Sequence, residues 1–214
     1  MLETSELRTN RDLYLFIASL GQDAVQTAET TERERSLEDY LKVLWQLGTS
    51  HQETETLSLA TFAGLLDAAL HRDAPPPFEV GWSHGYHRGE DTLVGYARWE
   101  RTILDQIVDL HEMQDAGILA NEHRYFGVDS PRGSRWYNFA PLTYLECAMA
   151  GTFNGWRPGD STGRDFVPGP VAVMDEAGHI TSADPRDLED PICPIDAVSW
   201  DMFADFLECG RCYE

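Results

Sequence analysis

Apolar residues recur every three or four positions through most of the first half of the chain, which is the spacing of amphipathic helices. A first helix is predicted to begin at Asn10, as its N-cap, and to end at Gly21, with Leu13 and Phe16 on its buried side. Residues 22–35 are mostly polar and offer little to a core. We predict that this stretch is a surface connection.

Two further helices are predicted from their capping residues. Ser36 is followed three positions later by Asp39, the pattern of a capping box, and Gly48 is predicted to end this helix in a left-handed conformation. Ser58 opens the next helix. The prolines at 75–77 must end it, because proline lacks the N–H that a helix requires.

The longest apolar stripe predicts a central helix over residues 92–116. Asp91 begins it, Leu104 and His111 lie on its apolar side, and Gly117 closes it. Ile118 then folds back as the apolar contact that follows such a glycine.

Beyond residue 119 the pattern changes to short aromatic runs separated by turn residues. Residues 122–128 and 134–139 flank the turn-forming segment 129–133, which predicts a β-hairpin. Residues 171–174 and 179–181 predict a second hairpin around Gly178.

The second half also contains helix signals. Thr143 with Glu146 predicts a capping box, and Leu142 with Cys147 the accompanying hydrophobic staple, in a helix that ends at Gly151. Residues 155–170, rich in glycine and proline, predict an ordered loop, and a last helix begins near Ser199.

These elements predict an α+β fold, in which a helix-rich N-terminal half packs with a small antiparallel sheet from the C-terminal half. The 214 residues suit a single acidic globular domain, helical over 1–119 and of mixed hairpin, helix and loop over 120–214.

The chain is strongly acidic, with a formal net charge of −21. Affinity for phosphate backbones depends on cations, so this charge argues against nucleic-acid binding, and it disfavours docking on an anionic membrane. A basic protein partner is the expectation, although a halophilic origin would also produce an acidic chain with Lys42 as its one lysine.

The expected compartment is the cytoplasm. The first residues are acidic where a secretion signal would be basic and then apolar, and no run approaches the roughly 18 apolar residues of a membrane span. Four cysteines are too few for a secreted disulfide scaffold.

The acidity is uneven. Residues 121–166 carry five arginines and five acidic residues, so this segment is neutral within an anionic chain. Arginine and aromatic side chains together are typical of recognition surfaces. The predicted binding residues of this segment are Arg124, Arg132, Arg135, Trp136, Tyr137, Trp156, Arg157 and Arg164. The alternative is that the arginines neutralise nearby acids while Trp136, Tyr137 and Phe139 fill the core.

Several short motifs resemble catalytic signatures without their context. Residues 159–163 read Gly-Asp-Ser-Thr-Gly, yet the surrounding prolines leave no room for the strand and helix of a nucleophile elbow. An anion held by backbone N–H groups there is the more plausible use. His111, Glu112 and Asp115 resemble half of a zinc motif, but a core histidine whose ring is bonded to Asp115 or to the backbone is the favoured interpretation.

Metal ligation is a further alternative. His84 and His87 have metal-ligand spacing in a predicted loop, and Cys209 with Cys212 has zinc or redox spacing. Neither pair has a second pair to complete it, so we predict no metal. We also predict no cofactor, because the chain contains no glycine-rich nucleotide loop.

The favoured hypothesis is a non-catalytic interaction protein that binds a protein partner through its acidic surface and residues 121–166. The alternative is a small-molecule enzyme or binding protein, with an anionic ligand held by Arg135 or Arg157 near the long helix 92–116. A metal-binding domain is the second alternative.

Overall fold

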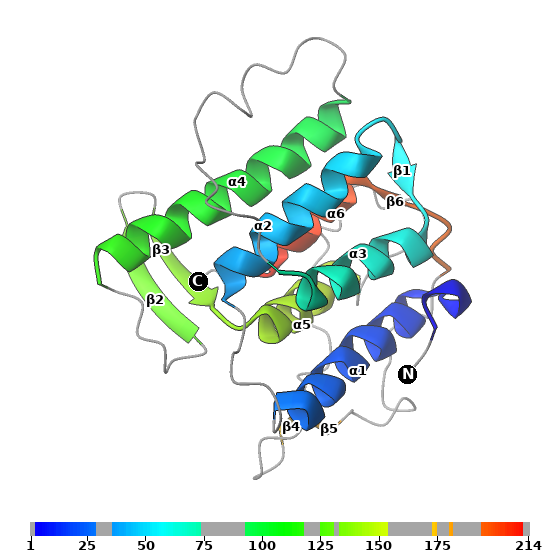
Figure 1. Ribbon diagram of the computed structural model, residues 1–214, viewed down its shortest axis with the longest axis horizontal. Coiled ribbons are helices and arrows are strands. Elements are labelled where there is room, and N and C mark those ends of the chain that lie inside the picture. Colours follow the sequence, from blue (N-terminus) through cyan, green and yellow to red (C-terminus); the bar gives the residue numbers. More distant parts are fainter. Residues whose placement is uncertain are drawn as a thin grey trace.

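The computed structural model describes residues 3–28, 36–73, 93–117, 125–130, 133–153, 173–174, 180–181 and 194–211, with backbone only at 21–28, 125–130, 133–136, 173–174 and 180–181. Helices dominate this part of the chain, and its strands form small antiparallel pairs (Figure 1). The α+β prediction is confirmed.

The helices are α1 (Asn10–Ala28), α2 (Leu37–Gly48), α3 (Leu59–His71), α4 (Val94–Asp115), α5 (Pro141–Thr152) and α6 (Trp200–Cys209), with short 3-10 turns at η1 (Thr4–Glu6) and η2 (Thr49–His51). The strand pairs are β1 (Thr56–Leu57) with β6 (Val198–Ser199), β2 (Tyr125–Ser130) with β3 (Gly133–Asn138), and β4 (Val173–Met174) with β5 (Ile180–Thr181).

Three predicted N-caps are confirmed. The Ser36 hydroxyl accepts the Asp39 N–H at 3.1 Å, Ser58 accepts from Thr61 at 3.0 Å, and Ser199 accepts from Met202 at 3.1 Å. Each serine thereby satisfies one of the N–H groups that a helix start leaves without a partner.

The first helix begins and ends differently from the prediction. Thr9 is the capping residue, because its hydroxyl accepts the Asp12 N–H at 3.1 Å while the Asp12 carboxylate accepts the Thr9 N–H at 2.9 Å. Asn10 is the first helical residue, and its buried amide donates to the Phe153 carbonyl at 3.1 Å. The helix continues through Gly21 to Ala28, because an interior glycine costs only about 1 kcal/mol relative to alanine.

Helix α2 ends at Gly48, as predicted, but this glycine is not left-handed. It lies in α2 with φ −63° and ψ −32°, and a β-carbon there would come within 2.1 Å of the Trp99 ring. The glycine is therefore required by the close approach of α4 rather than by a turn.

The central helix α4 begins at Val94, later than predicted, and ends at Asp115. Gly117 follows with φ +67°, which confirms the predicted left-handed residue after this helix. Asp91 and Ile118 lie outside the described residues, as do the prolines at 75–77 and the predicted loop 155–170.

The predicted capping box at Thr143 is wrong. Helix α5 begins with Pro141, whose fixed φ suits a first helical position, so Thr143 and Leu142 already lie inside the helix and the staple does not apply. The helix runs one residue past Gly151, which packs against Cys209: a β-carbon at Gly151 would approach the Cys209 β-carbon to 2.8 Å.

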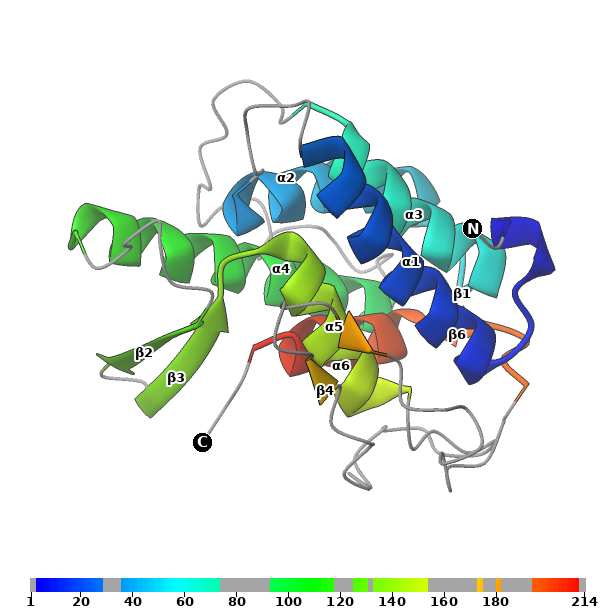
Figure 2. The same ribbon diagram turned by 90° about the horizontal axis from the view of Figure 1, so that it is seen from below.

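Both predicted hairpins are confirmed, with shifted ends. The β2–β3 ladder continues to the pair Ser130–Gly133, so it extends into the segment expected to form the turn. In Figure 2 this hairpin projects from the helical body below one end of α4. The β1–β6 pair, which joins the segment before α3 to the segment before α6, was not predicted.

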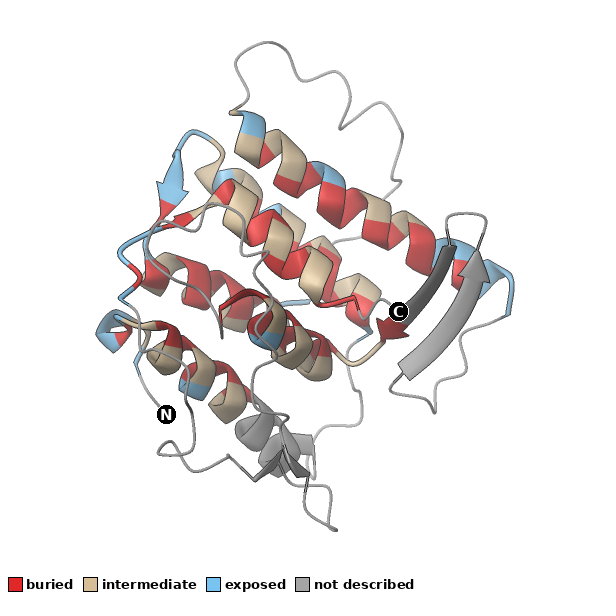
Figure 3. Ribbon diagram, turned by 180° about the vertical axis from the view of Figure 1, so that it is seen from behind, coloured by how far each residue is buried: buried red, intermediate tan, exposed pale blue. Residues whose placement is uncertain are grey.

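The core is rich in aromatic rings where α3, α4, α5 and α6 meet. Phe62 contacts Phe203 and Phe206 edge-on, with ring centroids 4.8 and 5.3 Å apart. Trp99 and Trp200 pack at 4.9 Å, and both are buried. The inward sides of the helices are accordingly buried along their length (Figure 3). Within the described part, no helix is long and apolar enough to cross a membrane.

Candidate functional site

The structure does not describe the side chains of most of the predicted binding residues. Arg124, Arg132, Trp156, Arg157 and Arg164 fall in undescribed segments. Arg135 and Trp136 are placed by backbone alone on β3, where they pair with Val128 and Gly127. Tyr137 is the one member of the set with a described side chain.

Tyr137 belongs to the core and not to an exposed contact surface. Only 5% of it is exposed, and its ring stacks on that of Phe139 with centroids 6.4 Å apart. The alternative interpretation, in which the aromatic residues of this segment pack inward, therefore holds for Tyr137. An aromatic residue at the base of a small hairpin buries more apolar area by facing the helices than by facing water.

The inward side of Tyr137 meets a buried polar group of α4. Its hydroxyl donates to Asp109 Oδ2 at 3.1 Å, and an Arg211 Nη nitrogen lies 3.3 Å from the same oxygen. The Arg211 guanidinium also sits over the Tyr137 ring, 5.7 Å from its centroid. We call Asp109, Tyr137 and Arg211 the Asp109 network. It lies where residues 121–166 meet α4, the junction at which the small-molecule alternative expected a ligand.

A second buried network lies one turn earlier on α4. The Tyr144 hydroxyl is 2.7 Å from Gln106 Oε1 and 2.5 Å from the Leu207 carbonyl, and the Gln106 amide nitrogen donates to that carbonyl at 3.1 Å. These bonds fix α4, α5 and α6 relative to one another. They give a buried polar group its partners, as burial requires.

His111 is not a core histidine. Its side chain is 48% exposed. Its partner is Glu38 of α2 and not Asp115, with 2.5 Å between His111 Nε2 and Glu38 Oε1. Lys42 pairs with the same Glu38 oxygen. The prediction failed because His111 stands at the edge of the apolar stripe, where the neighbouring helix offers a carboxylate instead of apolar side chains.

The Glu38–His111 contact places the start of α2 beside the end of α4. Three carboxylates lie at this end without an ion pair to any described residue: Asp39, Glu112 and Asp115, which we call the acidic tip. Glu112 and Asp115 are both exposed, in the last turn of α4. That turn contains no lysine or arginine to offset them.

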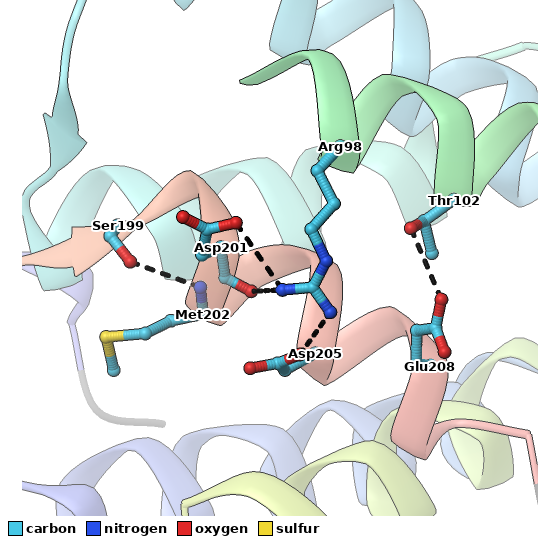
Figure 4. Close-up of polar contacts among 7 residues, drawn as sticks. All are labelled: Arg98, Thr102, Ser199, Asp201, Met202, Asp205 and Glu208. Atoms are coloured by element: carbon cyan, nitrogen blue, oxygen red, sulfur yellow. Dashed lines mark hydrogen bonds and ion pairs between the residues drawn. The ribbon is translucent and has the colours of Figure 1, made fainter. Parts of the chain in front are cut away.

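Three described cations, Lys42, Arg98 and Arg211, by contrast, each lie in an ion pair within the chain. Arg98 of α4 reaches two carboxylates of α6, Asp205 at 2.5 Å and Asp201 at 3.4 Å (Figure 4). Burial alone would lower the pKa of Arg98. Asp205 and Asp201 accept hydrogen bonds from it and carry negative charge, and together these effects outweigh burial and raise the pKa. One turn along, Thr102 donates to Glu208 at 3.4 Å.

The metal alternatives are only partly covered by the structure. His84, His87 and Cys212 lie outside the described residues, as do residues 159–163. Among the described side chains, no group of three or more His, Cys, Asp or Glu residues is placed to hold a metal ion. Burial raises the pKa of the Cys209 thiol, and the nearby Asp205 and Glu208 charges add to this effect.

We expect Cys209 to react slowly with iodoacetamide at neutral pH. A raised pKa leaves less of the thiolate, the reactive form, and the side chain is also screened by Gly151 of α5. Peptide mass spectrometry after timed alkylation measures the rate, with the urea-unfolded chain as the reference. Equal rates for the folded and unfolded chains would contradict this assignment.

A comparison of the chain with protein-family models, with curated proteins and with solved structures finds no significant match.

Proposed function

We propose that this protein is a non-catalytic interaction protein that binds a basic protein partner, and that the acidic tip is part of its contact surface. The observation that carries the proposal is the pair Glu112 and Asp115, exposed at the C-terminal turn of α4 without a compensating cation in that turn. The exposed members of residues 121–166 would extend this surface, since the β2–β3 hairpin projects beside this end of α4 (Figure 2).

Local stability does not explain why acids occupy this turn. The carbonyl groups at a helix C-terminus carry partial negative charge, so each carboxylate there costs about 0.3–1 kcal/mol at low ionic strength. Residues that destabilise their own helix, with no stabilising contact elsewhere to offset the cost, are candidates for function. A cationic partner would supply the missing positive charge.

The pairing of the cations supports the same proposal. Among the described residues, Lys42, Arg98 and Arg211 each lie against a carboxylate of this chain, and none of the three is paired with Glu112 or Asp115. A net charge of −21 creates a field that attracts a cationic partner and speeds encounter, and added salt weakens that attraction. With only four cysteines, the chain suits the reducing cytoplasm, where we propose that binding occurs.

The test removes the two α4 charges of the acidic tip without changing the size of the side chains. The double variant Glu112→Gln/Asp115→Asn is expected to weaken binding of a lysine-rich probe peptide by on the order of tenfold at low salt, as measured by calorimetry. It is also expected to flatten the dependence of affinity on salt and to raise the free energy of unfolding by up to about 1 kcal/mol, because the conflict with the helix dipole is removed.

The matched control is Glu53→Gln/Glu55→Gln, which removes the same charge from exposed residues before β1. If both double variants weaken binding equally, only the net charge matters and the tip is not a contact site. If neither variant changes affinity, the proposal of an acidic contact surface fails.

A further inference from the structure

We propose that the β2–β3 hairpin is a contact arm whose direction is set by the Asp109 network, with Arg211 as the clamp. Contact of the hairpin with the partner rests on the proposed function. The attachment of the hairpin to the helices through the Asp109 network does not. Asp109 and Arg211 are positioning residues in this proposal, and neither needs to touch the partner.

The hairpin is joined to the helical body at its base. Its strands pair only with each other in the described part of the chain, and in Figure 2 they project away from the helices. Tyr137 and Asn138, at the end of β3, are the hairpin residues with described, buried side chains. The direction of the whole arm therefore depends on how these residues are held.

Three elements meet at this base through one carboxylate oxygen. Asp109 Oδ2, on α4, accepts from the Tyr137 hydroxyl and pairs with Arg211, the second residue after the end of α6. Both charged side chains are at least nine-tenths buried, with 10% of Asp109 and 7% of Arg211 exposed. Asn138 is fully buried, and its Oδ1 accepts the Ala140 N–H at 3.0 Å, which directs the chain from β3 into α5.

A polar clamp does what an apolar contact would not. Apolar packing at this site would give similar stability but would tolerate sliding, whereas hydrogen bonds fix direction and fail when the partner atoms move apart. The ring of Tyr137 contacts both Phe139 and the Arg211 guanidinium, so rotation of the hairpin about its base would break the hydroxyl bond and these ring contacts together. The position of Arg211 and the direction of the arm are thus coupled.

Hydrogen exchange of the protein alone tests this inference. Asp109→Asn keeps the side-chain volume but removes the charge that holds Arg211. Its hairpin amides, in 125–130 and 133–138, are expected to exchange on the order of tenfold faster, while those of α2 and α3 keep their rates. Tyr137→Phe removes only the hydroxyl and is expected to have the same effect to a smaller degree, which keeps the test open if Asp109→Asn does not fold.

The control is Asp205→Asn, the same chemical change in the α4–α6 ion pair with Arg98, away from the hairpin. The inference is overturned if Asp109→Asn and Tyr137→Phe leave hairpin exchange unchanged, if they accelerate every helix equally, or if Asp205→Asn releases the hairpin as much. No partner is present in this measurement. A negative result in hydrogen exchange would therefore overturn the inference about the hairpin, whereas a negative result in the binding test would overturn only the proposed function.

Discussion

Replacement of Gly48 by alanine is expected to lower the free energy of unfolding by about 1–3 kcal/mol, although the same exchange inside a helix normally raises stability. The added β-carbon would lie 2.1 Å from Trp99 Cη2 and 2.5 Å from Cζ2. Trp99 is fully buried and packed against the rings of Tyr96 and Trp200, so it has no free space to move into. Overpacking therefore outweighs the gain in helix propensity.

Gly64 provides the matched control. It also lies inside a helix, α3, but a β-carbon there would meet no atom within 4 Å. Gly64→Ala is therefore expected to raise stability by about 0.5–1 kcal/mol. Urea unfolding of both variants measures the two changes, which should have opposite signs. A stabilised Gly48→Ala would show that α2 and α4 separate at little cost.

Phe62→Ala is expected to cause the largest loss, about 3–5 kcal/mol. The Phe62 ring is fully buried and lies against Phe153 of the α5 end as well as Phe203 and Phe206 of α6. Its removal leaves a cavity among rings that are themselves fixed by other contacts, so little of the space can collapse. The midpoint temperature of thermal unfolding should fall by roughly 10 °C or more, because each kcal/mol of lost stability lowers the midpoint by a few degrees in a chain of this size.

Leu15→Ala is the control for this prediction, since Leu15 is 37% exposed on α1 and its loss leaves no enclosed space. It is expected to cost well under 1 kcal/mol. Calorimetric scans of the two variants should differ clearly in midpoint. Similar midpoints would mean that the contact of α3 with α6 contributes little to stability.

The elements that were predicted correctly depend on local chemistry. Ser36, Ser58 and Ser199 cap helices through bonds to residues three positions later, and that pattern is visible in the sequence. The hairpins follow from turn residues between aromatic runs. Helix type and start are therefore legible wherever the determining atoms are close neighbours in the chain.

Two of the wrong interpretations involve remote partners, and others are local. Gly48 and Gly151 resemble helix stops in the sequence, yet their roles come from Trp99 and Cys209, which belong to other helices. At Pro141 a local signal was available and was outweighed by the Thr143 pattern, although proline is a frequent first residue of helices.

The Asp109 network could not be predicted from periodicity. Asp109 lies 28 residues from Tyr137 and 102 from Arg211, and helical spacing carries no information about such distant pairs. One signal was present: Gln106 and Asp109 are polar residues among the buried positions of α4, and buried polar groups require partners. That signal indicates a polar contact without identifying the other side.

The place of α6 has a consequence for biosynthesis. Its Phe203 and Phe206 complete the packing around Phe62, and it is preceded by β6, which pairs with β1 some 140 residues upstream in sequence. While the ribosome is still making the middle of the chain, α3 and α4 have no α6 to cover the apolar side chains that face it. We therefore expect these apolar side chains to stay exposed on the nascent chain, where chaperones can bind them, until residues 200–209 emerge.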